Sequence, residues 1–404
     1  MKTLVATLLL VPATALAGAY AIPTQSPRDL ALSQSAVAEQ NGPEAVMGNL
    51  GALAGQEGFS ATAAIELIAN KTDWSDPSLG SASTVYHPTY PPTAALAWGG
   101  KFSGGMAYGL GAGMRVSGGG SLFWPDNWAG STRIQNVDQR FFEARFGGGL
   151  EVAKGLKLGA ALVFYRITET LSQQVKLGGS TGSAEVGLSG NGWSFAASGE
   201  WQLPGIPVKI GVDYRNQGNL TLDGSAHFTD ILPPYQTLLQ DQNATQKTTV
   251  PTEFYVGASW AIQPGLHLMG AYSFEKWSVY KEDTFIGDEG FTVTVPRNYN
   301  NAWVYRVGLE EDRPTWAPQL ALRIGVQRSI SDQPSDTLSP SLSDASSWGF
   351  SAGAGWQISK SFRVDGAYML ALLDKVTASG DAFPGSYTTT VHFLTIGLTW
   401  RMPR

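Results

Sequence analysis

Strictly alternating side chains constrain this chain more than any other sequence feature. Through most of its length, stretches of about ten to fifteen residues alternate apolar with polar or small residues and are separated by turns. In one such stretch, Phe254, Val256 and Trp260 alternate with Glu253 and Ser259. A period of two indicates β-strands whose two faces meet different surroundings.

The same pattern indicates what surrounds each face of these strands. Large apolar residues occupy one face and charged residues the other, as in a strand between lipid and a polar interior. A sheet in lipid must close on itself, because its backbone groups find no water there. A soluble β-sandwich also alternates, but it rarely uses strands this long with this division of charges and aromatics. We therefore predict an all-β fold, a transmembrane antiparallel barrel, with aromatic girdles formed by Trp98, Trp201, Trp260, Trp277, Trp303, Trp356 and Trp400.

The turns divide the chain into about fourteen predicted strands. Short turns alternate with long loops near residues 71–91, 117–138, 227–249, 282–298 and 330–346. Short periplasmic turns and long outer loops are typical of outer-membrane barrels. The predicted strands are 58–70, 92–103, 106–116, 139–153, 156–176, 183–202, 207–224, 250–263, 265–281, 299–311, 318–330, 346–358, 361–375 and 387–400.

The N-terminus predicts export. Lys2, an apolar run and the small-x-small sequence at 15–17 are typical of a cleaved signal peptide over residues 1–17. The alternative, a membrane anchor, is disfavoured because a spanning helix needs about 20 apolar residues. We expect the bacterial outer membrane as the location, with the barrel over residues 58–404.

Residues 18–57 lie between these two parts. They combine a helix-forming stretch with a Gly/Ala-rich stretch and carry few charges. A barrel of about fourteen strands encloses more space than its own side chains fill. We predict that 18–57 folds into the lumen as a plug, or hatch, and the alternative is a disordered periplasmic tail.

Composition excludes several function classes. The chain has no Cys, and its net charge of −6 argues against a nucleic-acid partner. The four His, at positions 87, 227, 267 and 392, lie near no hydrolase or metal motif, so we expect neither an enzyme nor a cofactor.

At this point the mature chain resembles the FadL-like family of outer-membrane transporters for long-chain fatty acids and aromatic hydrocarbons. The hatch sequence Gly48–Ala54 is similar to the family's hatch motif, with Asn49, Gly51 and Ala52 at motif positions, but Leu50-Gly51 replaces the usual Pro. Further similar segments are Gly190–Gly199 with Trp193, Val212–Arg215, Pro251–Phe254 with Trp277, and Arg323–Pro334. The resemblance implies fourteen strands, a luminal hatch, passive uptake, and lateral exit through a kink in the third strand. The kink would fall in 106–120, at Gly109, Gly111 and Gly113, although these glycines could instead ease packing in a crowded wall.

Candidate ligand contacts follow from the chemistry of a fatty acid. An Arg can pair with the carboxylate, and an apolar slot would take the tail. Most inward charges are expected to be salt bridges between neighbouring strands. The candidates are Tyr20, Ile22, Met47, Leu50, Leu53, Phe123, Trp124, Arg145, Arg215, Arg306 and Arg323. An unusually apolar loop with Ile231, Leu232, Tyr235, Leu238 and Leu239 is expected either to capture ligand or to form a lid on its own barrel.

These features together predict a passive channel for hydrophobic molecules, with long-chain fatty acids as the leading cargo. The alternatives are aromatic hydrocarbon uptake, a general diffusion porin, and a surface protein that acts through its loops. We expect a monomer surrounded by outer-membrane lipid, with lipid or detergent in the lumen of purified protein.

Overall fold

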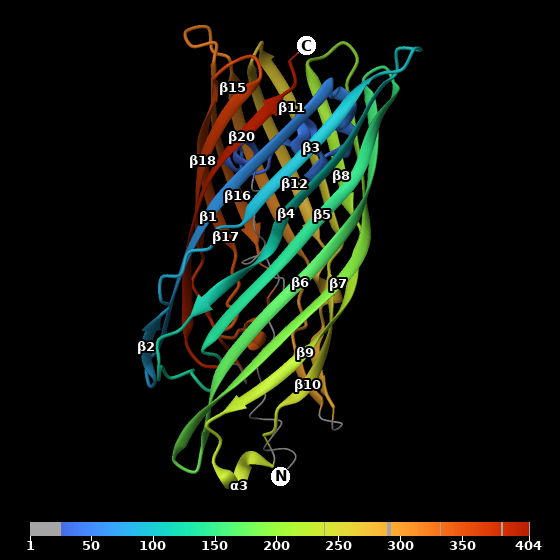
Figure 1. Ribbon diagram of the computed structural model, residues 1–404. Helices are drawn as coiled ribbons and strands as arrows, with labels where there is room; N and C mark the ends of the chain where they lie inside the picture. The colour runs from blue at the N-terminus through green and yellow to red at the C-terminus, as the bar shows by residue number, and fades with distance from the viewer. Residues whose placement is uncertain (1–25, 238, 289–291, 332, 381–382, 404) are drawn as a thin grey trace.

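A computed structural model describes residues 26–237, 239–288, 292–331, 333–380 and 383–403. Its strands form a closed antiparallel barrel of fourteen wall positions, as predicted (Figure 1). Pairing between β1 and β20 closes the wall, from Ser60 opposite Arg401 to Ser75 opposite Ser386. Ten positions are single strands: β1 Gly58–Asp76, β3 Pro92–Lys101, β4 Ala107–Phe123, β5 Asn136–Ala153, β6 Leu156–Leu177, β7 Ser180–Gln202, β16 Leu320–Ile330, β17 Ser347–Gln357, β18 Phe362–Leu373 and β20 Ser386–Arg401.

Each of the other four positions is divided between two strands. These are β8 Val208–Arg215 with β9 Gly218–Thr229, β10 Gln242–Val250 with β11 Glu253–Gln263, β12 Leu266–Glu275 with β13 Glu282–Gly287, and β14 Thr292–Pro296 with β15 Ala302–Asp312. The prediction of loops at 227–249 and 282–298 was therefore wrong where β10, β13 and β14 lie. In β10 the polar Lys247 faces outward while Ala244 and Gln246 are buried, so the lipid-facing pattern is lost there.

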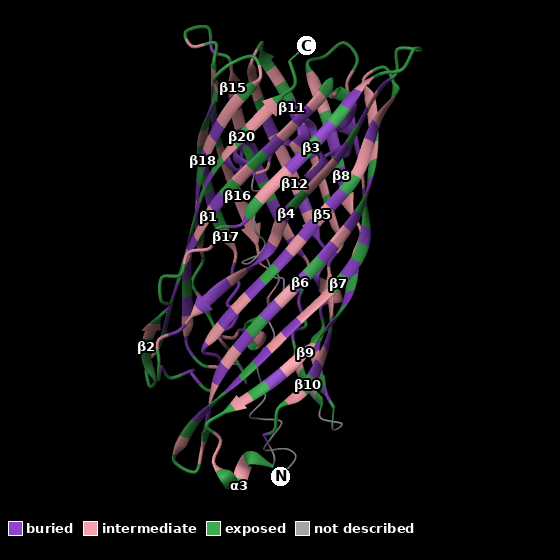
Figure 2. Cartoon of the chain, in the orientation of Figure 1, coloured by how far each residue is buried: buried purple, intermediate pink, exposed green. Residues whose placement is uncertain are grey.

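The outward face has the dimensions of a membrane band. Buried and exposed residues alternate along the strands (Figure 2). On β7 the exposed Trp193 and Trp201 are eight residues apart, and Trp348 and Trp356 on β17 repeat this spacing. At about 3.3 Å per residue and a tilt near 40°, eight residues span roughly 20 Å, close to the apolar band of outer-membrane barrels. Among the described residues, no helix is long and apolar enough to cross a membrane.

The hatch lies inside the barrel near its short-turn end, drawn in blue in Figure 1. It consists of the short helices α2 Pro27–Ala31, η2 Ala36–Ala38, η3 Pro43–Met47 and η4 Leu50–Gly55. Leu30, Leu50 and Leu53 have no exposed surface. The barrel begins at Gly58, directly after the hatch. The predicted signal peptide, Tyr20 and Ile22 lie outside the described residues.

Short elements complete the opposite, extracellular end. They are β2 Gly80–Ser83, α3 Pro233–Gln236, η5 Trp277–Val279, η6 Ser335–Thr337 and β19 Val376–Thr377.

Candidate functional site: the lumen and an opening in its wall

The wall is interrupted between β1 and β4. The third position, β3, pairs with β1 only as far as Ile65 opposite Pro92. It pairs with β4 only as far as Ala94 opposite Met114. Both neighbours continue outward for about ten residues, to Asp76 and Phe123, and no strand pairing joins them directly in the part of the chain that the structure describes. The segment 84–91 still runs beside β1, with a bridge between Ile68 and Thr89, so the sheet is interrupted between this segment and β4.

Isolated bonds and a bulge mark the edges of this opening. Asn70 Nδ2 donates to the Ser121 carbonyl at 3.4 Å, and Val85 N donates to the Phe123 carbonyl at 2.7 Å. On the far side of β4, the register with β5 shifts between Val116 and Gly118. A bulge bends a strand and increases its twist, so β4 turns away from β1 here.

The shift lies within the predicted 106–120 stretch but not at the three glycines proposed for it. Pairing is regular at Gly109, Gly111 and Gly113. A Cβ on Gly109 would overlap the carbonyl oxygen of Leu53, and one on Gly113 would lie 2.6 Å from Val46 Cγ1. These glycines therefore let the hatch approach the wall, which is closer to the alternative of crowded packing.

Asn49 fastens the hatch to the wall. Its side-chain nitrogen donates to the carbonyls of Val37 at 3.0 Å and Gly199 at 2.8 Å. Its side-chain oxygen accepts from Gly51 N at 3.1 Å and caps η4. A Cβ on Gly51 would lie 3.0 Å from the Lys157 carbonyl, so the Leu50-Gly51 pair suits close contact with β6. Ala52 is buried beside them.

A charged network joins α2 to the barrel. Arg28 Nη2 lies 2.5 Å from Glu310 Oε2, and Arg28 Nε donates to Glu310 Oε1 at 2.9 Å. Arg323 donates to Glu310 and Asp365, both at 2.7 Å. All four side chains are buried. Removing one partner of such a buried ion pair strongly destabilises the folded protein, because the other charge is left uncompensated.

The predicted Arg candidates lie in two different compartments. Arg215 and Arg306 line a luminal cavity of about 90 Å³ on the extracellular side of the hatch, with Arg115, Glu253, Glu275 and Tyr255. Apolar residues also line it, namely Val304, Leu373, Val391 and Phe393. Arg323 instead lines a cavity of about 290 Å³ on the periplasmic side, with Arg28 and Glu44. Arg145 is buried against Glu143. The structure thus places two of the four Arg candidates at one amphipathic site.

The three apolar hatch candidates among the described residues also separate. Met47 lines a small cavity between the hatch and the polar side of the lumen, together with Arg115 and Arg215. Leu50 and Leu53 pack into the wall with no exposed surface.

An aromatic cluster fills the extracellular half of the lumen. Trp124 and Trp128 stack with ring centroids 4.2 Å apart, and Trp74 meets Trp128 edge-on at 5.4 Å. Phe123, which is not part of this cluster, packs against His87 with ring centroids 4.2 Å apart. Trp124 was a predicted contact, and here its ring is fully packed.

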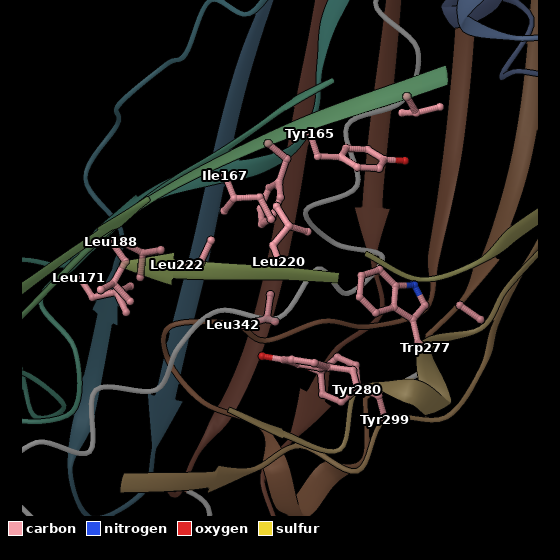
Figure 3. Packing of buried hydrophobic residues seen from close by; sticks show 14 of the residues in the cluster. Tyr165, Ile167, Leu171, Leu188, Leu220, Leu222, Trp277, Tyr280, Tyr299 and Leu342 are labelled. Carbon is pink, nitrogen blue, oxygen red and sulfur yellow. The ribbon is translucent and has the colours of Figure 1, made fainter. Parts of the chain in front are cut away.

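The 331–346 loop folds inward onto this cluster. The Trp124 indole donates to the Pro340 carbonyl at 3.0 Å. Leu342 is completely buried, among residues that include Leu222 and Tyr280 (Figure 3). The sequence predicts a long loop at 330–346 but not that it folds inward, because its Ser, Asp and Pro residues are typical of exposed turns.

The predicted capture loop packs on a neighbouring hairpin. Leu232 and Tyr235 approach Gly178 at the tip of the β6–β7 hairpin, and Ile231 packs in the same region. Leu239 is buried with Val175 and Ala184. Leu238 lies outside the described residues.

Comparisons with known proteins identify the family of this chain. A family model described as "Outer membrane protein transport protein (OMPP1/FadL/TodX)" matches residues 8–401. The chain belongs to this family. It is therefore an outer-membrane transport protein of the FadL/TodX type, a family that carries hydrophobic molecules. A comparison with curated protein sequences finds no match.

Solved members of the FadL/TodX type share the fold. A FadL homologue of Pseudomonas aeruginosa is 17% identical with a TM-score of 0.83, covering 94% of this chain and 99% of that one. The toluene transporter TodX of Pseudomonas putida is 14% identical with a TM-score of 0.76, covering 93% and 98%. The toluene transporter TbuX of Ralstonia pickettii is 17% identical with a TM-score of 0.70, covering 92% and 98%.

Proposed function

We propose that this protein takes up a hydrophobic compound from outside the cell and releases it sideways into the membrane between β1 and β4. The observation that supports this most directly is the end of strand pairing at Ile65 and Met114, beside a lumen closed by the hatch. The axial route would require the Arg28 network to break, whereas the contacts described across the opening are single hydrogen bonds, Asn70 to Ser121 and Val85 to Phe123.

The luminal cavity supports two classes of cargo. Arg215 and Arg306 line it together with Val391 and Phe393, a combination suited to a carboxylate and the start of a fatty-acid tail. A volume of about 90 Å³ is below the roughly 150 Å³ of an apolar cavity that holds benzene. A monoaromatic hydrocarbon would therefore need a smaller rearrangement than a long acyl chain. Long-chain fatty acids and aromatic hydrocarbons both stay candidates, and the named toluene transporters share the fold.

A cross-link across the opening tests the route. The chain has no Cys, so Asn70→Cys with Ser121→Cys would introduce a single disulfide where the two residues already touch. We expect uptake of palmitate or toluene by expressing cells to stop on oxidation and to return on reduction, while either single variant keeps it. An uptake rate that is the same with and without the disulfide would exclude lateral exit. Equal passage of small sugars would indicate a general porin instead.

A further inference from the structure

Glu66 is a buried carboxyl group that has no side-chain partner among the described residues. It lies on the inward face of β1, its side chain has no exposed surface, and neither carboxyl oxygen accepts a hydrogen bond from any described residue. No described Lys, Arg or His forms an ion pair with it. Burying an acceptor without a donor costs about 1–3 kcal/mol, and more for a charged group.

Other luminal acids show how unusual this is. Glu143 pairs with Arg115 at 2.8 Å, Asp213 pairs with Arg215 at 2.9 Å, and Glu310 pairs with two arginines. The lumen therefore supplies cations to several of its acids, while buried Glu275 and Glu169 accept hydrogen bonds from Trp277 and Gln139. Glu66 is left with neutral neighbours in a wall where arginine partners are common.

Its position is the edge of the opening. The residue before it, Ile65, makes the last β1–β3 pair, and Glu66 N donates to the Pro91 carbonyl at 3.1 Å. Immediately beyond Glu66, an isolated bridge, Ile68 with Thr89, joins β1 to the chain that precedes β3, so Glu66 lies where regular pairing gives way to single bonds. Opposite it on β20 is Thr395, whose hydroxyl donates to the Ile65 carbonyl and so turns away from the carboxyl. Ile68 and Phe393, the next inward pair toward the outside, are apolar.

We infer that Glu66 is a specificity-determining residue at the lateral opening, where it accepts a hydrogen bond from hydrophobic ligands that carry a hydroxyl group. The inference rests on the proposed lateral release. A passing hydroxyl satisfies the free acceptor, while the apolar remainder of the ligand contacts Ile68 and Phe393. A plain hydrocarbon leaves the acceptor unsatisfied, so a site of this kind favours the hydroxylated relative.

The test compares p-cresol with toluene, because the two differ by one hydroxyl. Initial uptake rates are measured in cells that express the wild type, Glu66→Leu or Glu66→Gln, after subtraction of vector cells. We expect the cresol-to-toluene rate ratio to fall about tenfold in Glu66→Leu, as for loss of one hydrogen bond to a buried acceptor. In Glu66→Gln the amide oxygen still accepts, so the ratio should stay within about threefold. Thr72→Val, buried on the same strand with its own Thr389 partner, is the control and should not change it.

The outcomes separate the two proposals. Toluene uptake by the wild type together with an unchanged ratio in Glu66→Leu would overturn the role of Glu66 and leave the transport function intact. Uptake of neither compound by the wild type would overturn both. Heat-modifiable migration checks that each variant folds, and Glu66→Met is a second apolar variant if Glu66→Leu does not assemble.

Discussion

The two halves of the lumen are closed by different physics. At the periplasmic end, the hatch is held by buried charges, above all Arg28 with Glu310, and by the Asn49 amide. At the extracellular end, closure is apolar and comes from stacked tryptophans and the inward loop at Leu342. Charged networks have exacting geometry, and breaking one leaves an uncompensated charge. Apolar packing is less directional, so a hydrophobic ligand can replace the contacts that it displaces.

The comparison assigns the halves different roles. The extracellular half is suited to admit apolar molecules, because they match its lining. The periplasmic half is suited to stay shut, because an apolar molecule offers nothing to Glu310 or Arg323. A ligand that enters from outside would then meet the opening beside β3 before it meets a periplasmic exit.

The largest effect is expected when the charged closure is broken. Glu310→Gln removes the negative charge shared by Arg28 and Arg323, together with one of the two acceptor oxygens, and leaves both arginines undercompensated. Removal of one partner from a buried pair costs about 3–5 kcal/mol. We expect faster proteolysis of the hatch and the appearance of ion conductance in planar bilayers.

A surface pair provides the matched control for Glu310→Gln. Arg328 and Asp374 form a partly exposed ion pair at 2.6 Å, so Arg328→Ala should cost less than about 1 kcal/mol and leave the hatch protected. Equal effects of the two variants would show that the buried network does not hold the hatch.

The second largest effect is expected when the apolar closure at the extracellular end is weakened. Leu342→Ala removes a completely buried side chain from the aromatic cluster and should cost about 2–4 kcal/mol locally. We expect faster hydrogen exchange in 331–346 and faster entry of toluene, with hatch proteolysis unchanged. Slower entry would mean that Leu342 forms part of the route rather than its closure.

The hatch cap should have a smaller effect. Asn49→Ala removes a helix cap and two donated hydrogen bonds, with an expected cost of about 1–2 kcal/mol. Hydrogen exchange of 50–55 should rise while that of 331–346 stays constant. A change confined to the extracellular half would contradict the division proposed here.

The smallest effect concerns pH. Burial, and then the negative charge of Asp29, raise the pKa of Glu44 to about 7, although Ser26 donates to it at 2.9 Å. The docked hatch therefore holds this proton more tightly than the free chain does. Docking should be strongest below about pH 4.5 and weaken as pH rises through 7. Hatch proteolysis should be faster at pH 8 than at pH 5, and Glu44→Gln should reduce that difference. The effect is small because Glu44 borders the periplasmic cavity and is partly exposed.

Much of the architecture could be predicted because lipid makes strict demands. Alternation such as Phe254 and Val256 opposite Glu253 requires a closed barrel, and fourteen wall positions were expected and found. The strands beyond the membrane could not be recognised, since water accepts polar residues such as Lys247 on the outward face of β10.

The site was less predictable, for a reason of geometry. Arg215 and Arg323 look alike in the sequence, since both lie on the inward faces of alternating strands. The barrel places the first at the luminal cavity and the second at the periplasmic network with Arg28.

The sequence by itself determined that the chain forms a barrel, because alternation and backbone hydrogen bonding act locally along each strand. Only the tertiary structure decided that β3 is too short to join its neighbours and that Arg28 meets Glu310, 282 residues away. The tertiary structure alone also left Glu66 without a side-chain partner among the described residues. Register and closure set these relations between distant strands, and no single segment of the sequence contains them.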